Sequence, residues 1–253
     1  PLELILFTLL GGTLLAVSAN VLNQIFEIET DRLMERTANR PLVTGEINKK
    51  SAYVYSISLG LVGFLVLYTQ TTELAAFIAL SANIFYSFIY TLVLKPRTNQ
   101  NIVIGGAAGA APVLIGWSAT GTNLDTGSWL LFLLVFLWTP AHFWALSIDK
   151  LNDYKDANFP MLPTQESYKR TSIFIGIYSC ATVLTSLLLA PILQLGMVYL
   201  LLSLIFGLYL MYKSYQLYRK QIKAISYFVF SNTYLAVIFL SMVADIFITL
   251  SSI

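Results

Sequence analysis

The sequence predicts an all-α, polytopic transmembrane helical bundle, and two observations lead to that fold class. Hydrophobic residues make up 57% of the 253 residues and charged residues only 11%, whereas soluble domains have about 45–50% and about 25%. The apolar residues gather in runs of about 20, the length that crosses a hydrocarbon core of about 30 Å. A soluble enzyme is therefore excluded.

Eight apolar runs are long enough to span a membrane as helices. They cover residues 4–26, 51–69, 74–94, 101–119, 129–148, 171–190, 196–212 and 227–250. Gly105, Gly106 and Pro112 fall inside the fourth run. They are tolerated there because neighbouring groups in a membrane bundle can satisfy the freed backbone.

The connections between the runs carry positive charge on one side only. All fifteen lysine and arginine residues lie after the first, third, fifth and seventh runs, and the other three connections have none. The positive-inside rule then places the basic loops in the cytoplasm or a mitochondrial matrix. We expect an integral protein of a bacterial inner (plasma) membrane or of the mitochondrial inner membrane, in contact with membrane lipid.

Charge and composition exclude several kinds of site. The formal net charge of +2 gives no polybasic surface for nucleic acid. Single residues of cysteine (Cys180) and histidine (His142) permit no internal disulfide, no cysteine-based zinc site and no multi-histidine metal centre.

Two cytoplasmic loops resemble each other, which predicts an internal repeat. Residues 42–51 match 162–171 at a displacement of 120, and Glu27 and Asp31 fall on Asp149 and Asp153 at a displacement of 122. We expect one transmembrane domain over residues 1–253, with parallel pseudo-repeats of about 1–120 and 121–253 whose equivalent sites meet at their interface. The chain begins at Pro1, without methionine or a signal peptide, so a further N-terminal helix is expected to be missing.

Acidic side chains are spaced by four residues at the ends of the first and fifth runs: Asn23, Glu27 and Asp31, then Asp149 and Asp153. Carboxylates at this spacing repel by about 0.2–0.5 kcal/mol, and a helix C-terminus disfavours an anion by about 0.3–1 kcal/mol. Mg²⁺ removes both penalties and usually binds one or two carboxylates plus substrate phosphates. The pattern predicts a Mg²⁺-diphosphate site.

Cationic side chains near these clusters would bind the phosphates. They are Arg32, Arg36, Arg40, Lys95, Arg97 and Lys150. The alternative is an ordinary solvated helix end with local ion pairs, such as Glu27 with Arg32.

A diphosphate beside an apolar cavity predicts prenyl transfer. In that chemistry, Mg²⁺ and basic groups stabilise the departing diphosphate while an acceptor captures the allylic carbocation. Tyr154 is one of several aromatic residues near the inner ends of the third and fifth runs. Its ring could stabilise a cation or only pack at the interface.

His142 lies seven residues before Asp149, about 10 Å deeper along the helix. A polar ring at that depth usually faces the protein interior and marks a pathway or ligand. From the sequence alone the ring could bind a ligand, pack through a hydrogen bond or act as a base.

Three segments resemble the UbiA-type intramembrane prenyltransferases, specifically their haem branch, the protohaem IX farnesyltransferases. These are N-x3-E-x3-D-x2-M-x-R-T-x2-R-P-L at 23–42, LKPRTNQNIVIGGAAGAAPVLIGW at 94–117 and WTPAHFWALSIDKLNDYKDANFPMLP at 138–163. The resemblance implies a nine-helix fold and Mg²⁺-dependent transfer of farnesyl from farnesyl diphosphate to a vinyl group of haem B, giving haem O. Haem is then a substrate, and haem A synthase or oxidase-assembly proteins are possible partners. With haem as acceptor, three interpretations of His142 remain open: an axial ligand to haem iron, a hydrogen-bonded packing residue, or a base that positions the added water.

The same resemblance implies roles for individual residues. Asn23, Glu27, Asp31 and Asp153, with Asp149 beside them, carry Mg²⁺-diphosphate, and the phosphate contacts are Arg36, Arg40, Lys95, Arg97 and Lys150. Two departures stand out: Glu27 replaces a usual aspartate, and the family's first helix, with its Lys-Pro-Arg motif, is absent ahead of Leu4.

Two other functions remain open. Another member of the superfamily would prenylate a quinone precursor or a chlorin, and the segments around Met34 and His142 argue against it. A secondary transporter also has repeats and membrane acids, but its site favours the midplane, whereas these acids lie at one interface.

Overall fold

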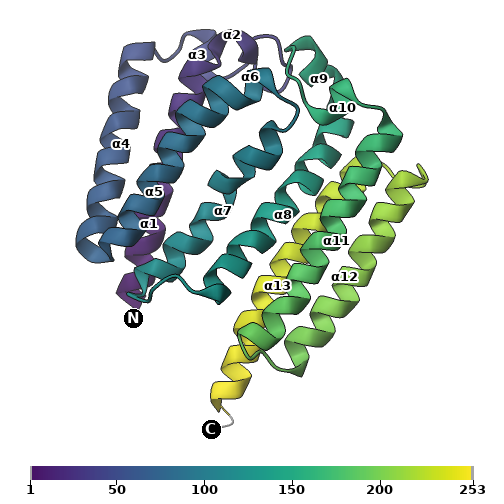
Figure 1. Cartoon of the computed structure of the whole chain (residues 1–253). Helices are drawn as coiled ribbons and strands as arrows, with labels where there is room; N and C mark the ends of the chain where they lie inside the picture. Colours follow the sequence, from purple (N-terminus) through teal and green to yellow (C-terminus); the bar gives the residue numbers. More distant parts are fainter. Residues whose placement is uncertain (1, 252–253) are drawn as a thin grey trace. The chain divides into compact units, whose positions relative to one another are not determined.

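The computed structural model describes residues 2–251 and, for side chains, residues 2–248. Eight helical segments are long and apolar enough to cross a membrane, and no strand occurs in the described chain (Figure 1). The predicted all-α class and the eight spans are confirmed. The spans are α1 (Leu2–Phe26), α4 (Lys49–Gln70), α5 (Glu73–Ile84) continued by η1 (Phe85–Leu94) and α6 (Lys95–Arg97), α7 (Asn101–Ala119), α8 (Thr126–Asp149), α11 (Tyr168–Ile192), α12 (Met197–Tyr218) and α13 (Ala224–Ser251).

Side-chain caps fix where four of the spans begin. Asn48, Thr72, Asp125 and Ser167 each accept a hydrogen bond from a backbone N–H in the first turn of α4, α5, α8 and α11. Such caps satisfy donors that a helix start leaves free. Short helices α2 (Ile28–Asp31), α3 (Pro41–Thr44), α9 (Leu151–Asp156) and α10 (Leu162–Gln165) lie in the connections.

The seventh span continues six residues beyond its predicted end, from residue 212 to Tyr218. Residues 213–218 read Lys-Ser-Tyr-Gln-Leu-Tyr, a composition typical of the membrane interface. The apolar run ends before these polar residues, but the helix continues through them. It ends at Tyr218, just before Lys220, whose φ of 57° is left-handed.

The chain divides into two compact units. The first contains Pro1–Leu124 with Asn152–Thr164, and the second contains Asp125–Leu151 with Gln165–Ile253. The division near residue 124 lies close to the predicted repeat boundary, but segment 152–164 belongs to the first unit. The repeat itself stays a prediction.

In the first unit, α1 packs along α4 and α5 packs along α7 (Figure 1). Small residues allow the close approach of α1 and α4. A Cβ added at Gly11 would lie 2.7 Å from Leu67 Cγ and 2.9 Å from the Gly63 carbonyl oxygen. A Cβ added at Gly12 would meet nothing within 4 Å.

We therefore expect Gly11→Ala to destabilise the protein by about 1–3 kcal/mol, because an overpacked contact must force the two helices apart. Gly12→Ala is the matched control, and it should be neutral or stabilising because alanine favours a helix over glycine. The measurement is the midpoint of thermal unfolding in detergent. Equal midpoints for the two variants would show that the α1–α4 contact is not tight.

In the second unit, α11 packs against α8 and α12, and α13 packs against α8 and α12. A buried hydroxyl network links three of these helices. Tyr199 OH donates to the Ser186 carbonyl over 2.7 Å, and Tyr234 OH donates to Ser186 Oγ over 2.8 Å. Such bonds between helices stabilise membrane bundles.

Buried Asp245, near the end of α13, accepts hydrogen bonds from the backbone N–H groups of Gly196 and Tyr199. A carboxylate at this place offsets the positive N-terminal end of α12. The contact fastens the start of α12 to α13.

Candidate active site

Asn23, Glu27 and Asp31 are buried where α1 passes into α2, each with less than a tenth of its surface exposed. The helix breaks at Glu27, but backbone hydrogen bonds continue across the break. Glu27 N donates to Asn23 O over 3.0 Å and Asp31 N donates to Glu27 O over 2.7 Å. The predicted spacing of four residues is therefore a real helical spacing.

The segment α5–η1–α6 lies beside α1 in one register. Asn83 donates to the Leu15 carbonyl (2.8 Å), Asn23 donates to Thr91 Oγ1 (3.1 Å), and Lys95 donates to Glu27 Oε2 (2.6 Å). Each pair is 68 residues apart in sequence, so the two segments run parallel. This register places two polar groups opposite Asn23 and Glu27.

A π-helix, η1, supplies one of those groups. Thr91 donates to the Tyr86 carbonyl, five residues earlier, over 2.8 Å, which leaves Thr91 Oγ1 to accept from Asn23. The stacked Tyr86 and Tyr90 rings lie 5.3 Å apart, and Tyr90 packs so closely on Gly105 that an added Cβ would lie 2.3 Å from its ring. Such π-helical segments are frequent at functional sites, and the sequence analysis did not predict this one.

Two buried ion pairs hold the carboxylates. Glu27 Oε2 lies 2.6 Å from Lys95 Nζ, and Asp31 Oδ2 lies 2.5 Å from Arg40 Nη1. Thr37 Oγ1 donates to the Asp31 carbonyl over 2.8 Å and so folds the loop that brings Arg40 back. Removing one partner of such a buried pair typically costs about 3–5 kcal/mol.

The suggested local pair of Glu27 with Arg32 was wrong. Arg32 instead lies 3.1 Å from exposed Glu29, because both side chains belong to the solvated face of the turn. The partner of Glu27 comes from a distant segment, which spacing along one helix cannot reveal.

Two buried oxygen atoms beside these pairs lack a hydrogen-bond partner among the described residues, Glu27 Oε1 and Asn101 Oδ1. Asn101 opens α7 and its Nδ2 makes long contacts to the carbonyls of Lys95 (3.4 Å) and Pro160 (3.5 Å). Buried polar atoms are nearly always satisfied, and carboxylate and amide oxygens suit Mg²⁺. By its chemistry, each of these oxygens therefore suits a cation.

Within the described residues no three His, Cys, Asp or Glu side chains gather to form a metal site by themselves. Mg²⁺ commonly takes only one or two carboxylates and completes its shell with phosphate oxygens and water. The chemistry of the donors therefore suits Mg²⁺ together with a phosphate, and the predicted ligand set stays a prediction.

Segment 152–164 folds onto this site within the first unit. The Phe159 ring centroid lies 4.6 Å from Lys95 Nζ, a cation–π contact. Tyr154 is buried in one cluster with Met34 and Ile102. Its predicted role toward a substrate cation stays a prediction.

The remaining predicted residues of the first unit are more open. Arg36 and Arg97 are exposed and Asp153 is half-buried. None of the three takes part in an ion pair among the residues that the structure describes. In the second unit, Asp149 is the last residue of α8 and Lys150 follows it. Asp149 Oδ2 lies 3.5 Å from Lys150 Nζ.

His142 is buried in the second unit between two aromatic rings. The ring centroids of Trp138 and Phe228 each lie 4.2 Å from the imidazole centroid. Ser231 Oγ donates to the Phe228 carbonyl over 2.7 Å, so it must accept from His142 Nδ1–H, 2.7 Å away. The proton then sits on Nδ1 and the lone pair on Nε2.

Three residues of the site were missed by the sequence analysis: Thr91, Asn101 and Phe159. The only available signal was polarity, because Thr91 and Asn101 are polar residues at the inner ends of apolar runs. Phe159 carried no signal at all.

Comparison with known proteins gives concordant matches. The model of the UbiA prenyltransferase family matches residues 1–243. Proteins named protoheme IX farnesyltransferase from Clavibacter sepedonicus and Rhodococcus jostii are 42% and 41% identical, over 96% of this chain and 81% and 82% of their own lengths. The one from Thermus thermophilus is 42% identical over 93% of this chain. The chain spans only 39% of that relative's length.

Solved structures resemble the fold at low sequence identity. A digeranylgeranylglyceryl phosphate synthase structure has a TM-score of 0.80 at 22% identity, covering 97% of this chain and 86% of its own. A UbiA homolog from Archaeoglobus fulgidus, bound to GPP and Mg²⁺, has a TM-score of 0.68 at 17% identity, covering 96% and 88%.

Proposed function

Because the chain belongs to the UbiA prenyltransferase family, we propose that it transfers farnesyl from farnesyl diphosphate to a vinyl group of protohaem IX, giving haem O. The observation that carries the reaction type is the buried pairing of Glu27 with Lys95 and Asp31 with Arg40. This arrangement offers both the anions that bind a divalent cation and the cations that bind phosphate. Haem as acceptor is supported by relatives that are about 42% identical and are named protoheme IX farnesyltransferase.

Mg²⁺ would be held by Asn23, Glu27 and Asp31, with Asp153 of the same unit as a further proposed ligand. Asp149 belongs to the second unit, and its role toward the metal stays a prediction. When bound, Mg²⁺ neutralises charge on the diphosphate as it departs. Lys95 and Arg40 would exchange their carboxylate partners for phosphate oxygens, and arginine can contact two of them at once. Arg36 and Arg97, which are exposed in the same unit, are proposed phosphate contacts. The phosphate contact of Lys150, in the second unit, stays a prediction.

The protein also positions the reacting groups. The allylic C–O bond breaks with its electron pair leaving on the diphosphate, and the vinyl π electrons form a C–C bond from the terminal vinyl carbon to the allylic carbon. Water then adds to the cation left at the inner vinyl carbon and loses one proton to solvent, which gives the hydroxyl. The Phe159 ring restrains the Lys95 ammonium, which keeps the charge fixed where the leaving group develops its own. The apolar cluster of Met34, Ile102 and Tyr154 keeps water from that side.

The test is to incubate the purified protein with haem, farnesyl diphosphate and Mg²⁺ and to search for farnesylated haem by mass spectrometry. We expect product with Mg²⁺ and none in EDTA. A parallel incubation offers an aromatic quinone precursor and a chlorin as acceptors. Prenylation of either of these, with haem unchanged, would overturn the haem assignment in favour of another branch of the family.

The protein is integral to a membrane, and we propose that its basic loops and active site face the cytoplasm or matrix. The support is the confinement of all fifteen Lys and Arg to alternate connections. Cysteines placed at exposed Gln100 and exposed Asn123, in a Cys180→Ser background, should react with an impermeant thiol reagent from opposite sides. Reaction of both from one side would contradict the orientation.

A further inference from the structure

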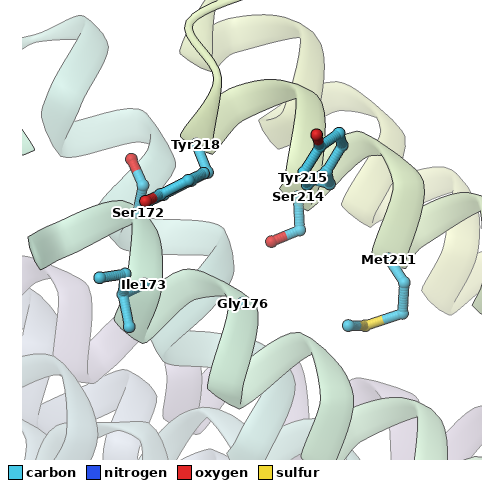
Figure 2. A pocket seen from close by; sticks show the side chains of 7 residues that line it. All are labelled: Ser172, Ile173, Gly176, Met211, Ser214, Tyr215 and Tyr218. Atoms are coloured by element: carbon cyan, nitrogen blue, oxygen red, sulfur yellow. The ribbon is translucent and has the colours of Figure 1, made fainter. Parts of the chain in front are cut away.

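The second unit contains an open groove between α11 and α12, with a volume of about 300 Å³. It is lined by Ser172, Ile173 and Gly176 of α11 and by Met211, Ser214, Tyr215 and Tyr218 of α12. In Figure 2, Ser172 and Tyr218 are drawn at one end of the groove and Met211 at the other. Ile173 and Tyr215 are 44% and 54% exposed on spanning helices, so the groove opens toward lipid.

At the cytoplasmic end of the groove, Tyr168 of α11 contacts α12 and the turn that follows α12. Tyr168 OH donates to the Leu217 carbonyl over 2.8 Å and its own carbonyl accepts from Ser172 Oγ over 2.8 Å. The Lys220 ammonium lies 5.1 Å from the centroid of the Tyr168 ring. A cation is therefore held next to the groove by an aromatic face.

Lys220 occupies a backbone position that suits glycine. Its φ is 57°, and the hydrogen bonds Lys220 N to Leu217 O and Gln221 N to Gln216 O end α12 in the manner of a Schellman turn. A non-glycine residue in the left-handed region costs about 1 kcal/mol or more. This turn fixes the backbone from which the Lys220 side chain reaches the Tyr168 ring.

The surroundings of Lys220 are cationic. The lysines and arginines next to the groove in α11, in α12 and in the turn after it are Lys169, Arg170, Lys213, Arg219, Lys220 and Lys223. Among the described residues, Arg170 with Glu166 is the only ion pair formed by any of them. Their positive charge is therefore nearly uncompensated.

We propose that this groove binds one anionic phospholipid. An acyl chain lies along Gly176 and Met211, and the phosphate is bound by Lys220 and Arg219. Basic pockets between transmembrane helices on the cytoplasmic side are suited to anionic headgroups. A prenyl diphosphate fits less well, because in the described residues of α11, α12 and the turns at their cytoplasmic ends Glu166 alone offers a carboxylate, and its partner is Arg170. These segments therefore leave no acidic group to hold Mg²⁺. This site is independent of the proposed prenyl transfer.

Native mass spectrometry of the purified full chain tests the proposal, with equimolar palmitoyl-oleoyl phosphatidylglycerol and phosphatidylcholine added. We expect the wild type to retain phosphatidylglycerol preferentially. Lys220→Asn should lower that retention about fivefold, the effect of one cation near an anionic headgroup. Asparagine tolerates the left-handed conformation, so this variant keeps its fold. The matched control is Lys50→Asn, an exposed cytoplasmic lysine of α4, which should retain lipid as the wild type does.

A second variant tests the acyl-chain part of the site. A Cβ at Gly176 would lie 3.4 Å from Ser214 Oγ, so the side chain of Gly176→Leu should fill the groove and lower the retention of both lipids. Equal retention of the two lipids by the wild type, or wild-type retention in both Lys220→Asn and Gly176→Leu, would overturn the proposal. Displacement of phosphatidylglycerol by an equimolar amount of farnesyl diphosphate would overturn it too, because the groove would then be a prenyl diphosphate site.

Discussion

Turnover should fall by about 10²- to 10³-fold in both Asp31→Asn and Asp153→Asn, the loss that follows removal of one group aimed at the developing charge. Each substitution keeps the size of the side chain and removes an anionic oxygen from the proposed Mg²⁺-diphosphate site. The measurement is farnesylated haem formed per enzyme at saturating Mg²⁺. The free Mg²⁺ concentration at half-maximal rate should rise as well, which a purely structural defect would not cause.

The two variants separate catalysis from stability. Asp31 is paired with Arg40 and is 3% exposed, so its replacement should also lower the free energy of unfolding by about 3–5 kcal/mol. Half-buried Asp153 takes part in none of the ion pairs among the described residues, so Asp153→Asn should unfold as the wild type does. Glu29→Gln is the control, since Glu29 shares α2 with Asp31 but is exposed and paired with Arg32. Near-normal turnover in both aspartate variants, or activity that persists in EDTA, would remove these residues from the metal site.

The spans could be predicted because one physical requirement determines them. A backbone in hydrocarbon must satisfy its own hydrogen bonds over about 30 Å, so a helix of about 20 apolar residues follows from composition alone. Seven of the eight runs agree with the structure to within three residues at each end. The exception is α12, whose last residues are polar and lie at the membrane interface. A search for apolar runs therefore ends before the helix does.

The π-helix η1 could not be predicted for a different reason. Its ten residues, Phe85–Leu94, are as apolar as their neighbours, and the change from an α-helix depends on contacts with other segments. The Tyr90 ring packs against Gly105, where a side chain would clash with it. Thr91 Oγ1 accepts a hydrogen bond from Asn23. None of these partners is near in sequence.

The sequence analysis could predict only the part of the candidate site that depends on local spacing. Asn23, Glu27 and Asp31 share one helix and one period, so their grouping is local. Their partners come from segments 68 residues away or from across a loop, as with Arg40. Lys95 and Arg40 were predicted to be phosphate ligands, which stays a prediction, and the sequence analysis did not predict their ion pairs with Glu27 and Asp31.

His142→Ala should shift the Soret band of bound haem and weaken haem binding by more than about tenfold if the ring ligates iron, one of the three interpretations that the sequence leaves open. Loss of even an outer-shell partner of a metal ligand costs about 10- to 100-fold in affinity. The geometry in the second unit supports this role. Trp138 and Phe228 cover both faces of the ring and Ser231 engages Nδ1, so Nε2 presents the lone pair that a haem iron accepts.

Ser231→Ala provides the graded comparison, because it removes the hydrogen bond that fixes the proton on Nδ1 while keeping the imidazole. Haem affinity should fall less than in His142→Ala, and farnesyl diphosphate affinity should be unchanged in both variants. An unaltered spectrum with lost turnover would identify His142 as the base that positions the added water. An unaltered spectrum with normal turnover and only a lower unfolding temperature would leave His142 as a packing residue between Trp138 and Phe228.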